Sequence, residues 1–263
     1  MSVVQNHKDL EGAIEKTSTL AEKSFGNGDI FIEKFITNAR HIEIQVFGFG
    51  AQGSVHLFER DCSMQRRYQK IIEESPAPEI DRTVIESMAA SAVKLASDVK
   101  YEGAGTVEFI YDIDEKKYYF LEMNTRIQVE HPVSELLTGV DLIAEQILIA
   151  SNEKLRVKQD EIEFKGHSIE CRINAEDPET FMPSPGQINL FHAPGGPGVR
   201  IDSHVYSGYN VPPNYDSLIA KIITHAETRN GAIKKMLFAL NETVVEGIKT
   251  NISLHKKLSL IHI

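Results

Sequence analysis

The 263-residue chain contains only two cysteines, Cys62 and Cys171. This spacing matches neither a disulfide framework nor a zinc site, so the sequence excludes a disulfide-stapled fold and favours a reducing compartment. Cys62 lies between Asp61 and Ser63 and is expected to be a small packing residue, not a nucleophile.

Long apolar runs and excess positive charge are also missing. No apolar run approaches about 18 residues, so no transmembrane helix is expected, and the N-terminus lacks a signal-peptide pattern. The net charge of −10 argues against nucleic-acid binding and against an anionic membrane surface. A hydrophobic content of 41% and a charged content of 25% are ordinary for a globular protein. The expected location is therefore cytoplasmic, with neither nucleic acid nor membrane as a partner.

Polar side chains recur at every second position between Glu122 and Glu130. In an extended chain these alternate residues share one face of a strand, and the apolar residues between them share the other. The residues on the polar face are Glu122, Asn124, Arg126, Gln128 and Glu130. A row of polar and ionisable groups of mixed sign is suited to a pocket that holds a metal and an anion.

A hairpin is expected just before this row. Two β-rich runs, 106–111 and 118–122, flank a short polar loop centred on Glu115, which places Glu108 opposite Glu122. Directly opposed carboxylates would lie about 5 Å apart and repel each other. A divalent cation such as Mg²⁺ would turn this cost into a binding site. The alternative is a pair of solvated glutamates on an exposed face. The Glu-Met-Asn-Thr-Arg sequence that begins at Glu122 favours the metal site over this alternative.

The remaining pattern predicts an α+β protein with antiparallel hairpins and with helices packed on one side. Helices are expected at residues 6–25, 80–99 (with Val99 on its buried stripe), 141–150 and 229–240, the last closing the chain. Strands are expected at residues 30–36 and 41–47, with 54–59 pairing back on the latter. Short strands and Pro/Gly-rich turns begin at Gly166, so a domain boundary is expected at residues 151–166.

Three long motifs resemble one known family. Residues 59–70, 122–131 and 170–178 are similar, in order and in spacing, to biotin carboxylase, the ATP-grasp subunit of acetyl-CoA carboxylase and related enzymes. The resemblance covers nearly the whole chain. It implies a partial ATP-grasp domain at 1–151 followed by the biotin carboxylase C-terminal domain at 166–263.

The resemblance also implies a reaction. It is the ATP-dependent carboxylation of biotin by bicarbonate through a carboxyphosphate intermediate, which is the first half-reaction of acetyl-CoA carboxylase. The implied cofactors are ATP and Mg²⁺ or Mn²⁺, with biotin as a carrier-bound substrate. The implied partners are a biotin carboxyl carrier protein, a carboxyltransferase and, in the full-length protein, a second copy in a homodimer. One alternative is another bicarbonate-activating ligase such as carbamoyl phosphate synthetase, and another is a non-catalytic fragment. The Arg172 segment and the Pro/Gly-rich C-terminal region favour biotin.

Metal and nucleotide contacts follow from the same resemblance. Mg²⁺ on the nucleotide phosphates would be held by Glu108 and Glu122, with Asn124 as a possible third oxygen donor. The residues implied to contact the nucleotide are Glu33, Lys34, Ile36, His41, Gln65, Tyr68, Ile110 and Leu121. Taken alone, His41 would be interpreted as a packed or surface histidine. Tyr68 stands where many family members have histidine, which puts that contact in doubt.

The residues implied to act on bicarbonate and biotin are Lys70, Arg126, Gln128, Val129, Glu130 and Arg172. Lys70 and Arg126 would receive the bicarbonate or the transferred phosphoryl group, because a three-oxygen anion suits a point charge and a guanidinium fork. Gln128 and the backbone of Val129 would orient the anion. Glu130 would be the general base. Arg172 would stabilise negative charge on the ureido oxygen of biotin.

The two ends of the chain depart from the family pattern. Met1 falls just after the place where the glycine-rich phosphate loop would end, so two upstream lysines that bind ATP are not in the chain. Residues 258–263 do not resemble the family. The chain is therefore expected to be a piece of a longer protein and to be inactive by itself.

Overall fold

The computed structural model describes residues 2–153 and 158–261, and its two compact units are Met1–Ala39 and Arg40–Ile263. The first unit contains a 3₁₀ turn, η1 (His7–Asp9), and the helix α1 (Leu10–Phe25). Gly26 ends α1 in the left-handed conformation, with φ of 72°, so the expected helix is confirmed. The strand expected at 30–36 is wrong, because this run belongs to no strand. A β-rich pattern is local, whereas a strand also requires a neighbour that completes its hydrogen bonds.

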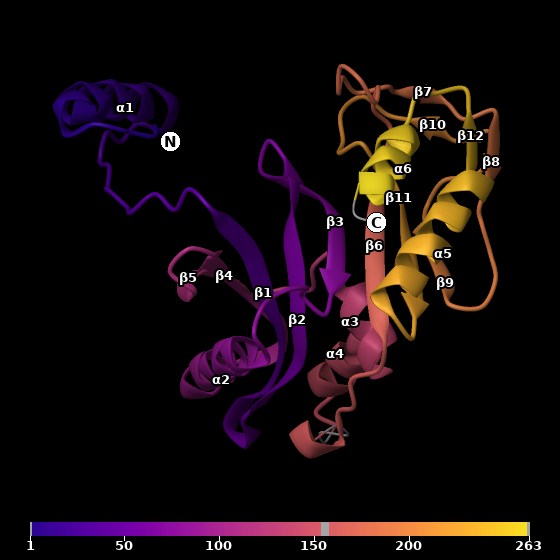
Figure 1. Ribbon diagram of the computed structural model, residues 1–263, viewed down its shortest axis with the longest axis horizontal. Coiled ribbons are helices and arrows are strands. Elements are labelled where there is room, and N and C mark those ends of the chain that lie inside the picture. Colours follow the sequence, from indigo (N-terminus) through magenta and orange to yellow (C-terminus); the bar gives the residue numbers. More distant parts are fainter. Residues whose placement is uncertain (1, 154–157, 262–263) are drawn as a thin grey trace. The chain divides into compact units, whose positions relative to one another are not determined.

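An eight-stranded sheet forms the centre of the second unit, in the order β5-β4-β1-β2-β3-β6-β11-β9 (Figure 1). Its strands are β1 (Ala39–Phe49), β2 (Ser54–Arg66), β3 (Gln69–Ser75), β4 (Glu102–Asp112), β5 (Lys117–Asn124), β6 (His167–Asn174), β9 (Val199–Ser203) and β11 (Leu218–Ala226). Two small sheets pair β7 (Gly186–Gln187) with β10 (Asn210–Val211) and β8 (Leu190–His192) with β12 (Val244–Glu246). The expected hairpin of 41–47 with 54–59 is confirmed in β1 and β2.

Five helices accompany these strands in the described part of the second unit. They are α2 (Arg82–Asp98), α3 (His131–Thr138), α4 (Leu142–Ala150), α5 (Arg229–Glu242) and α6 (Ile252–Ile261). Short 3₁₀ turns are η2 (Gly50–Gln52) and η3 (Gln159–Glu161). The expected helices are confirmed with small shifts of their ends, and Asp141 caps α4 by accepting a hydrogen bond from the Ala144 N–H at 2.8 Å. The chain does not close with α5, because β12 and α6 follow it. Residues 262 and 263 lie outside the described residues.

Helix α2 covers the apolar face of β1 and β4. Asp81 caps the helix, and the Met88 and Ala92 side chains pack on Ile42 and Ile44 of β1. Val99 does not join this stripe and is 61% exposed. Since α2 ends at Asp98, the helical period no longer determines the direction of the next side chain.

The opposite face of β1 is polar and equally buried. Glu43 and Gln45 alternate with the isoleucines and are fully buried. Helix α3 packs on this polar side, where Ser134 accepts a hydrogen bond from Arg60 at 2.8 Å. Helices therefore cover both faces, and the expectation of helices on one side is wrong. The alternation of polar and apolar residues shows which face of a strand is apolar, but it does not show that a second helix buries the polar face.

Strands from the C-terminal part of the chain continue the same sheet. β6 pairs with β3, and α5 and α6 cover β6 and β11 around a core that includes Ile173, Ile222 and Met236. The sheet is thus continuous across the boundary expected at 151–166, and that boundary stays a prediction. No described helix combines the length and the apolar character needed to cross a membrane.

Candidate active site

Lys70 connects three carboxylates on the polar side of the sheet. Its Nζ lies 2.6 Å from Glu43 Oε2, 3.0 Å from Glu108 Oε1 and 2.7 Å from Glu130 Oε1. The register runs from Met64–Ile72 to Gln65–Lys70, which leaves Ile71 as an extra residue in β3. Such a bulge turns the next side chain to the other face. Lys70 thereby reaches the polar side, where the neighbouring carboxylates raise its pKa against the opposing effect of burial.

Arg172 approaches the same carboxylate from β6. Its guanidinium donates from Nε to Glu73 Oε1 at 2.6 Å and from a terminal nitrogen to Glu130 Oε2 at 2.8 Å. Glu130, which is 2% exposed, therefore has Lys70 on one oxygen and Arg172 on the other. The structure brings together two basic residues and the carboxylate that the sequence assigned to one reaction, although Arg172 lies beyond the expected domain boundary.

Arg60 is a central residue of this site that sequence reasoning missed. It is fully buried, and its Nε donates to Glu43 Oε1 at 2.6 Å. Its terminal nitrogens donate to the side chains of Gln45, Thr106, Gln128 and Ser134. Burial alone would raise the pKa of Glu43, but the charges of Arg60 and Lys70 outweigh burial and lower it to about 2. The sequence signal that could have indicated Arg60 is the polar face of residues 41–47. If that face is buried, the charge of Glu43 requires a cation beside it.

The predicted metal ligands share one end of the β4–β5 hairpin. Glu108 pairs with Glu122 across the two strands, which confirms the predicted pair. The loop is not centred on Glu115, because Asp112 pairs with Lys117, and a bulge at Leu121 brings Glu122 opposite Glu108. The Asn124 side-chain N–H₂ donates to Glu108 Oε1 at 3.1 Å and to Glu122 Oε1 at 3.2 Å, so both carboxylates point toward one place. Burial would raise the pKa of Glu108, but the hydrogen bond from His41 and the charge of Lys70 lower it to about 2. Glu108 is thus ionised, as a metal ligand must be.

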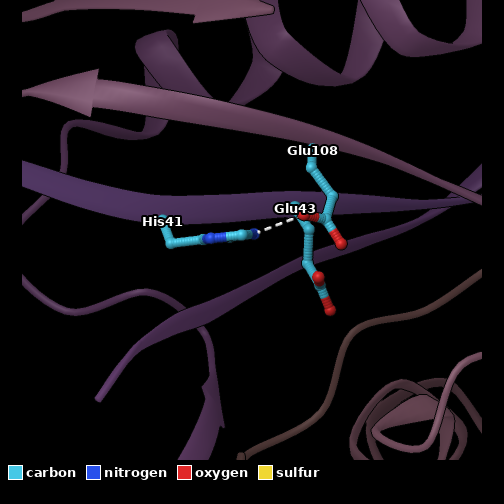
Figure 2. A group of neighbouring side chains, drawn as sticks. All are labelled: His41, Glu43 and Glu108. Carbon is cyan, nitrogen blue, oxygen red and sulfur yellow. Dashed lines mark ion pairs between the residues drawn. The ribbon is translucent and has the colours of Figure 1, made fainter. Parts of the chain in front are cut away.

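His41, Glu43 and Glu108 form a second group whose ligand atoms lie within 4.8 Å of one another (Figure 2). His41 Nε2 is 2.8 Å from Glu108 Oε2, and the other ring nitrogen lies 3.1 Å from the amide nitrogen of Gln65. Both oxygens of Glu43 already contact Arg60 and Lys70. The oxygen donors better suited to a hard cation are therefore those of the hairpin.

The chain between β5 and α3 differs from the expectation. The strand ends at Asn124, so the alternating face predicted through Glu130 is wrong beyond that residue. Gln128 and Glu130 are nevertheless buried, and Gln128 donates to Glu108 Oε1 at 2.8 Å. Arg126 is exposed and donates to Asn124 Oδ1 at 3.2 Å. Polar residues here converge through a turn before α3, because Pro132 at the first turn of that helix favours a helix start over a continued strand.

The remaining nucleotide contacts stay predictions. Tyr68 lies 85% exposed between β2 and β3. Ile110 is half-buried on β4, and Leu121 is the exposed extra residue at the bulge in β5. Glu33, Lys34 and Ile36 belong to the first compact unit, whereas the site residues above belong to the second.

Two buried residues near or on α6 hold the backbone of β6 beside the site. Asn251 and His255 both reach the carbonyl oxygen of Arg172, at 3.0 and 2.7 Å. Asn251 also accepts a hydrogen bond from the Asn174 N–H at 2.8 Å. Sequence reasoning missed this arrangement. It fixes the strand position from which the Arg172 side chain extends.

We expect His255 to make the protein sensitive to acid. Burial lowers the pKa of His255 to about 4, against the hydrogen bond to the Arg172 carbonyl, which acts the other way. An unfolded chain binds the proton near pH 6.5, so stability should be lost as the pH falls from about 6.5 to about 4, by roughly 3 kcal/mol. Urea unfolding across this range should show a shallower pH slope for His255→Gln than for the wild type. His192→Gln, at an exposed position on β8, is the control. Identical slopes for the wild type and His255→Gln would contradict the assignment.

Two family models match the chain. Residues 1–158 match "Carbamoyl-phosphate synthase L chain, ATP binding domain", and residues 170–261 match "Biotin carboxylase C-terminal domain". Together with the sheet and its buried carboxylates, these matches define an ATP-grasp protein with a biotin carboxylase C-terminal domain. The chain belongs to the biotin carboxylase family.

Curated relatives and solved structures agree with this assignment. The chain is 54% identical over 258 residues to "Biotin carboxylase" of Pseudomonas aeruginosa, covering 98% of this chain and 57% of the relative. It is 55% identical over 257 residues to "Biotin carboxylase 1" of Bacillus subtilis, covering 97% and 57%. A biotin carboxylase complex with β,γ-ATP from Campylobacter jejuni superposes with a TM-score of 0.93 at 48% identity, over 99% of this chain and 58% of that chain. The chain thus spans a little over half the length of these relatives.

Proposed function

We propose that this chain carries the bicarbonate- and biotin-handling site of an enzyme that carboxylates biotin at the expense of ATP. The observation that carries the proposal is Glu130, buried between Lys70 and Arg172 with one oxygen toward each. A base for bicarbonate and a cation for biotin must lie within reach of each other for carboxyl transfer. One carboxylate that contacts both cations meets this requirement.

The first step activates bicarbonate. Lys70 and Arg126 bind the anion, and Gln128 and the Val129 backbone orient it. Lys221 donates to the Val129 carbonyl at 2.7 Å and so holds this turn. Glu130 accepts the bicarbonate proton. The freed oxygen attacks the γ-phosphorus of ATP, ADP leaves, and carboxyphosphate forms.

The second step transfers the carboxyl group to biotin. Carboxyphosphate gives CO₂ and phosphate, and the ureido nitrogen of biotin loses its proton to the phosphate and attacks the CO₂. Negative charge develops on the ureido oxygen during this attack. Arg172 stabilises that charge. Glu73 accepts from Nε of the guanidinium and Glu130 accepts from one terminal nitrogen, so the other terminal nitrogen is the one that we assign to the ureido oxygen.

The residues present fit a magnesium ion that accompanies the nucleotide. Glu108 and Glu122 offer hard carboxylate oxygens directed to one place, and Asn124 stands between them. These are ligands that Mg²⁺ prefers, and Mn²⁺ accepts the same set. When bound there, the ion would neutralise charge on the phosphates of ATP.

Related structures support the ligands and the assembly. The biotin carboxylase domain of Hydrogenobacter thermophilus 2-oxoglutarate carboxylase is a dimer in complex with MgADP, ADP and bicarbonate, and it shares 46% identity with this chain at a TM-score of 0.90. We infer the same ligands and a homodimer for the full-length protein. Biotin is presented on a carboxyl carrier protein, and a carboxyltransferase consumes the product. We also propose that the parent enzyme is an acetyl-CoA carboxylase of the cytoplasm. The names of the relatives support the choice of enzyme, because those at 53–55% identity are named biotin carboxylase and a pyruvate carboxylase subunit follows at 49%.

The proposal is tested by separating its two steps. We expect Arg172→Ala to reduce biotin carboxylation by about 10²–10³-fold, because one preorganised charge contact is lost, and to spare much of the bicarbonate-dependent ATP hydrolysis. The assay uses the Pseudomonas aeruginosa relative with this chain in place of its matching segment, and the unmodified chimera is the reference. Arg67→Ala, at an exposed position in the β2–β3 turn, is the control. Equal loss of both activities would overturn this division of roles.

A further inference from the structure

A second pair of glutamates lies behind Arg172, away from the proposed substrates. Glu73 on β3 and Glu170 on β6 are direct partners in the antiparallel register. Both are fully buried. Directly opposed residues have Cβ atoms about 4.5–5.5 Å apart, so their carboxyl groups occupy one small region.

Most oxygens of this pair lack a donor. Glu73 Oε1 accepts from Arg172 at 2.6 Å. Among the described residues, no group donates to Glu73 Oε2 or to either oxygen of Glu170. The Ser168 hydroxyl, two residues before Glu170 on the same face of β6, is buried without a partner as well. Buried acceptors without donors are costly, and two adjacent carboxylates cannot both stay ionised at low cost. A single proton on this pair supplies one of the missing donors and removes one of the two charges.

We propose that Glu73 and Glu170 form a carboxyl pair that shares one proton and positions Arg172. Glu73 carries the negative charge because it contacts the guanidinium. Glu170 carries the proton and donates it toward Glu73 or Ser168. Both glutamates are therefore positioning residues that act through Arg172.

The surrounding charges support this division. Burial and the charge of Glu73 raise the pKa of Glu170 well above its usual range, against the charges of Lys221 on β11 and Arg172. Burial also raises the pKa of Glu73 to about 7, although Arg172 opposes this rise.

Further ionisable groups face the pair from the elements packed around it. Glu130, at the N-terminus of α3, and Glu43, on β1, add negative charge and favour retention of the proton. Helix α3 also carries His131 and Glu135, and Glu135 is paired with Arg200 at 2.6 Å.

The shared proton affects how Arg172 acts in carboxyl transfer, and this part of the inference rests on the proposed function. When Glu73 is ionised and Glu170 is protonated, Glu73 anchors Arg172 through Nε, and the guanidinium still presents positive charge to the substrates. A second charge on Glu170 would draw the guanidinium toward the sheet and weaken its effect on the ureido oxygen. Loss of the proton at high pH should therefore reduce carboxyl transfer more than bicarbonate-dependent ATP hydrolysis.

The first experiment measures the proton directly on this chain, without substrates. Infrared spectra should show the carbonyl stretch of a protonated carboxylic acid in the wild type at pH 7, and Glu170→Gln should remove it. Glu86→Gln, at an exposed position on α2, should leave it unchanged. If the wild-type band is absent at pH 7, or if it survives in Glu170→Gln, the proposal is overturned. The wild-type spectrum alone keeps the test decisive if a variant does not fold.

The second experiment measures stability against pH. The folded-state pKa of Glu170 is raised above its unfolded value of about 4.3, so its contribution to stability is lost as the pH rises through the folded pKa. Glu170→Gln should therefore gain stability relative to the wild type between pH 5 and pH 9. A stability difference that does not change with pH would overturn the proposal.

Kinetics of the chimera then test the effect on Arg172. Glu170→Gln, which mimics the protonated acid, should keep biotin carboxylation at pH 7 and lose the alkaline decline of the wild type. Glu73→Gln should raise KM for biotin with little change in ATP hydrolysis. Unchanged alkaline decline in Glu170→Gln would overturn the positioning role. A failure of the proposed function would instead appear as an inactive unmodified chimera, with the infrared and stability results intact.

Discussion

Replacement of Arg60 by methionine is expected to lower the free energy of unfolding by about 3–5 kcal/mol. Arg60 is fully buried and donates to five side chains from β1, β4, α3 and the turn before α3. Without it, Lys70 is the ion-pair partner that remains to Glu43 among the described residues, and several buried polar groups lose a donor. An unpaired buried charge costs far more than a surface ion pair contributes.

Urea unfolding of the chain measures this effect. Lys94→Met, which removes the exposed Lys94–Asp98 pair on α2, is the control and should change the free energy by less than about 1 kcal/mol. The double variant Arg60→Met with Glu43→Leu should recover part of the loss, because it removes both charges together. A cost for Arg60→Met similar to that of Lys94→Met would show that the network contributes little.

The second large effect is expected at Glu130. Glu130→Gln should reduce both biotin carboxylation and bicarbonate-dependent ATP hydrolysis by about 10²–10⁴-fold, since general-base catalysis supplies a factor of this size. The amide keeps the shape of the side chain but cannot accept the bicarbonate proton. Both activities fall together because proton removal precedes both steps, in contrast to the result expected for Arg172→Ala.

Steady-state assays of the chimera provide the measurement. Glu179→Gln, at an exposed position after β6, is the matched control and should leave both activities unchanged. Thermal unfolding of each variant separates chemistry from folding. If Glu130→Gln retained ATP hydrolysis with bicarbonate, another group would have to serve as the base.

Local patterns predicted the parts of the site that depend on neighbouring residues. The β4–β5 hairpin follows from a short loop, because the loop fixes the register of the strands that it joins, as in the pairing of Asp112 with Lys117. The cap at Asp141 is equally local. Such features need no knowledge of the distant chain, and the structure confirms them. The bulge at Leu121, which brings Glu122 opposite Glu108, is not determined by the loop.

Contacts between distant strands could not be predicted in the same way. Arg60 has polar partners on several elements, and Glu73 accepts from Arg172 on another strand. Nothing in the local sequence states which strands become neighbours. The bulge at Ile71, which directs Lys70 to the polar side, also depends on register with β2. The motif resemblance assigned Lys70, Glu130 and Arg172 to one site. The residues that anchor them, such as Arg60 and Glu73, could be identified only from the three-dimensional structure.

The pairing of β3 with β6 limits how the two matched regions can move and be separated. β3 lies in the region matched by the ATP-binding family model, and β6 lies in the region matched by the C-terminal model. Their ladder joins Ile72 to Cys171 and Ser75 to Ser168, so a hinge between the regions would have to break main-chain hydrogen bonds. Expression of either region alone would leave an open strand edge, which is a template for aggregation. The two regions are therefore joined by one continuous sheet and should move as one rigid unit. A chimera between family members is best made with its junctions outside residues 69–174.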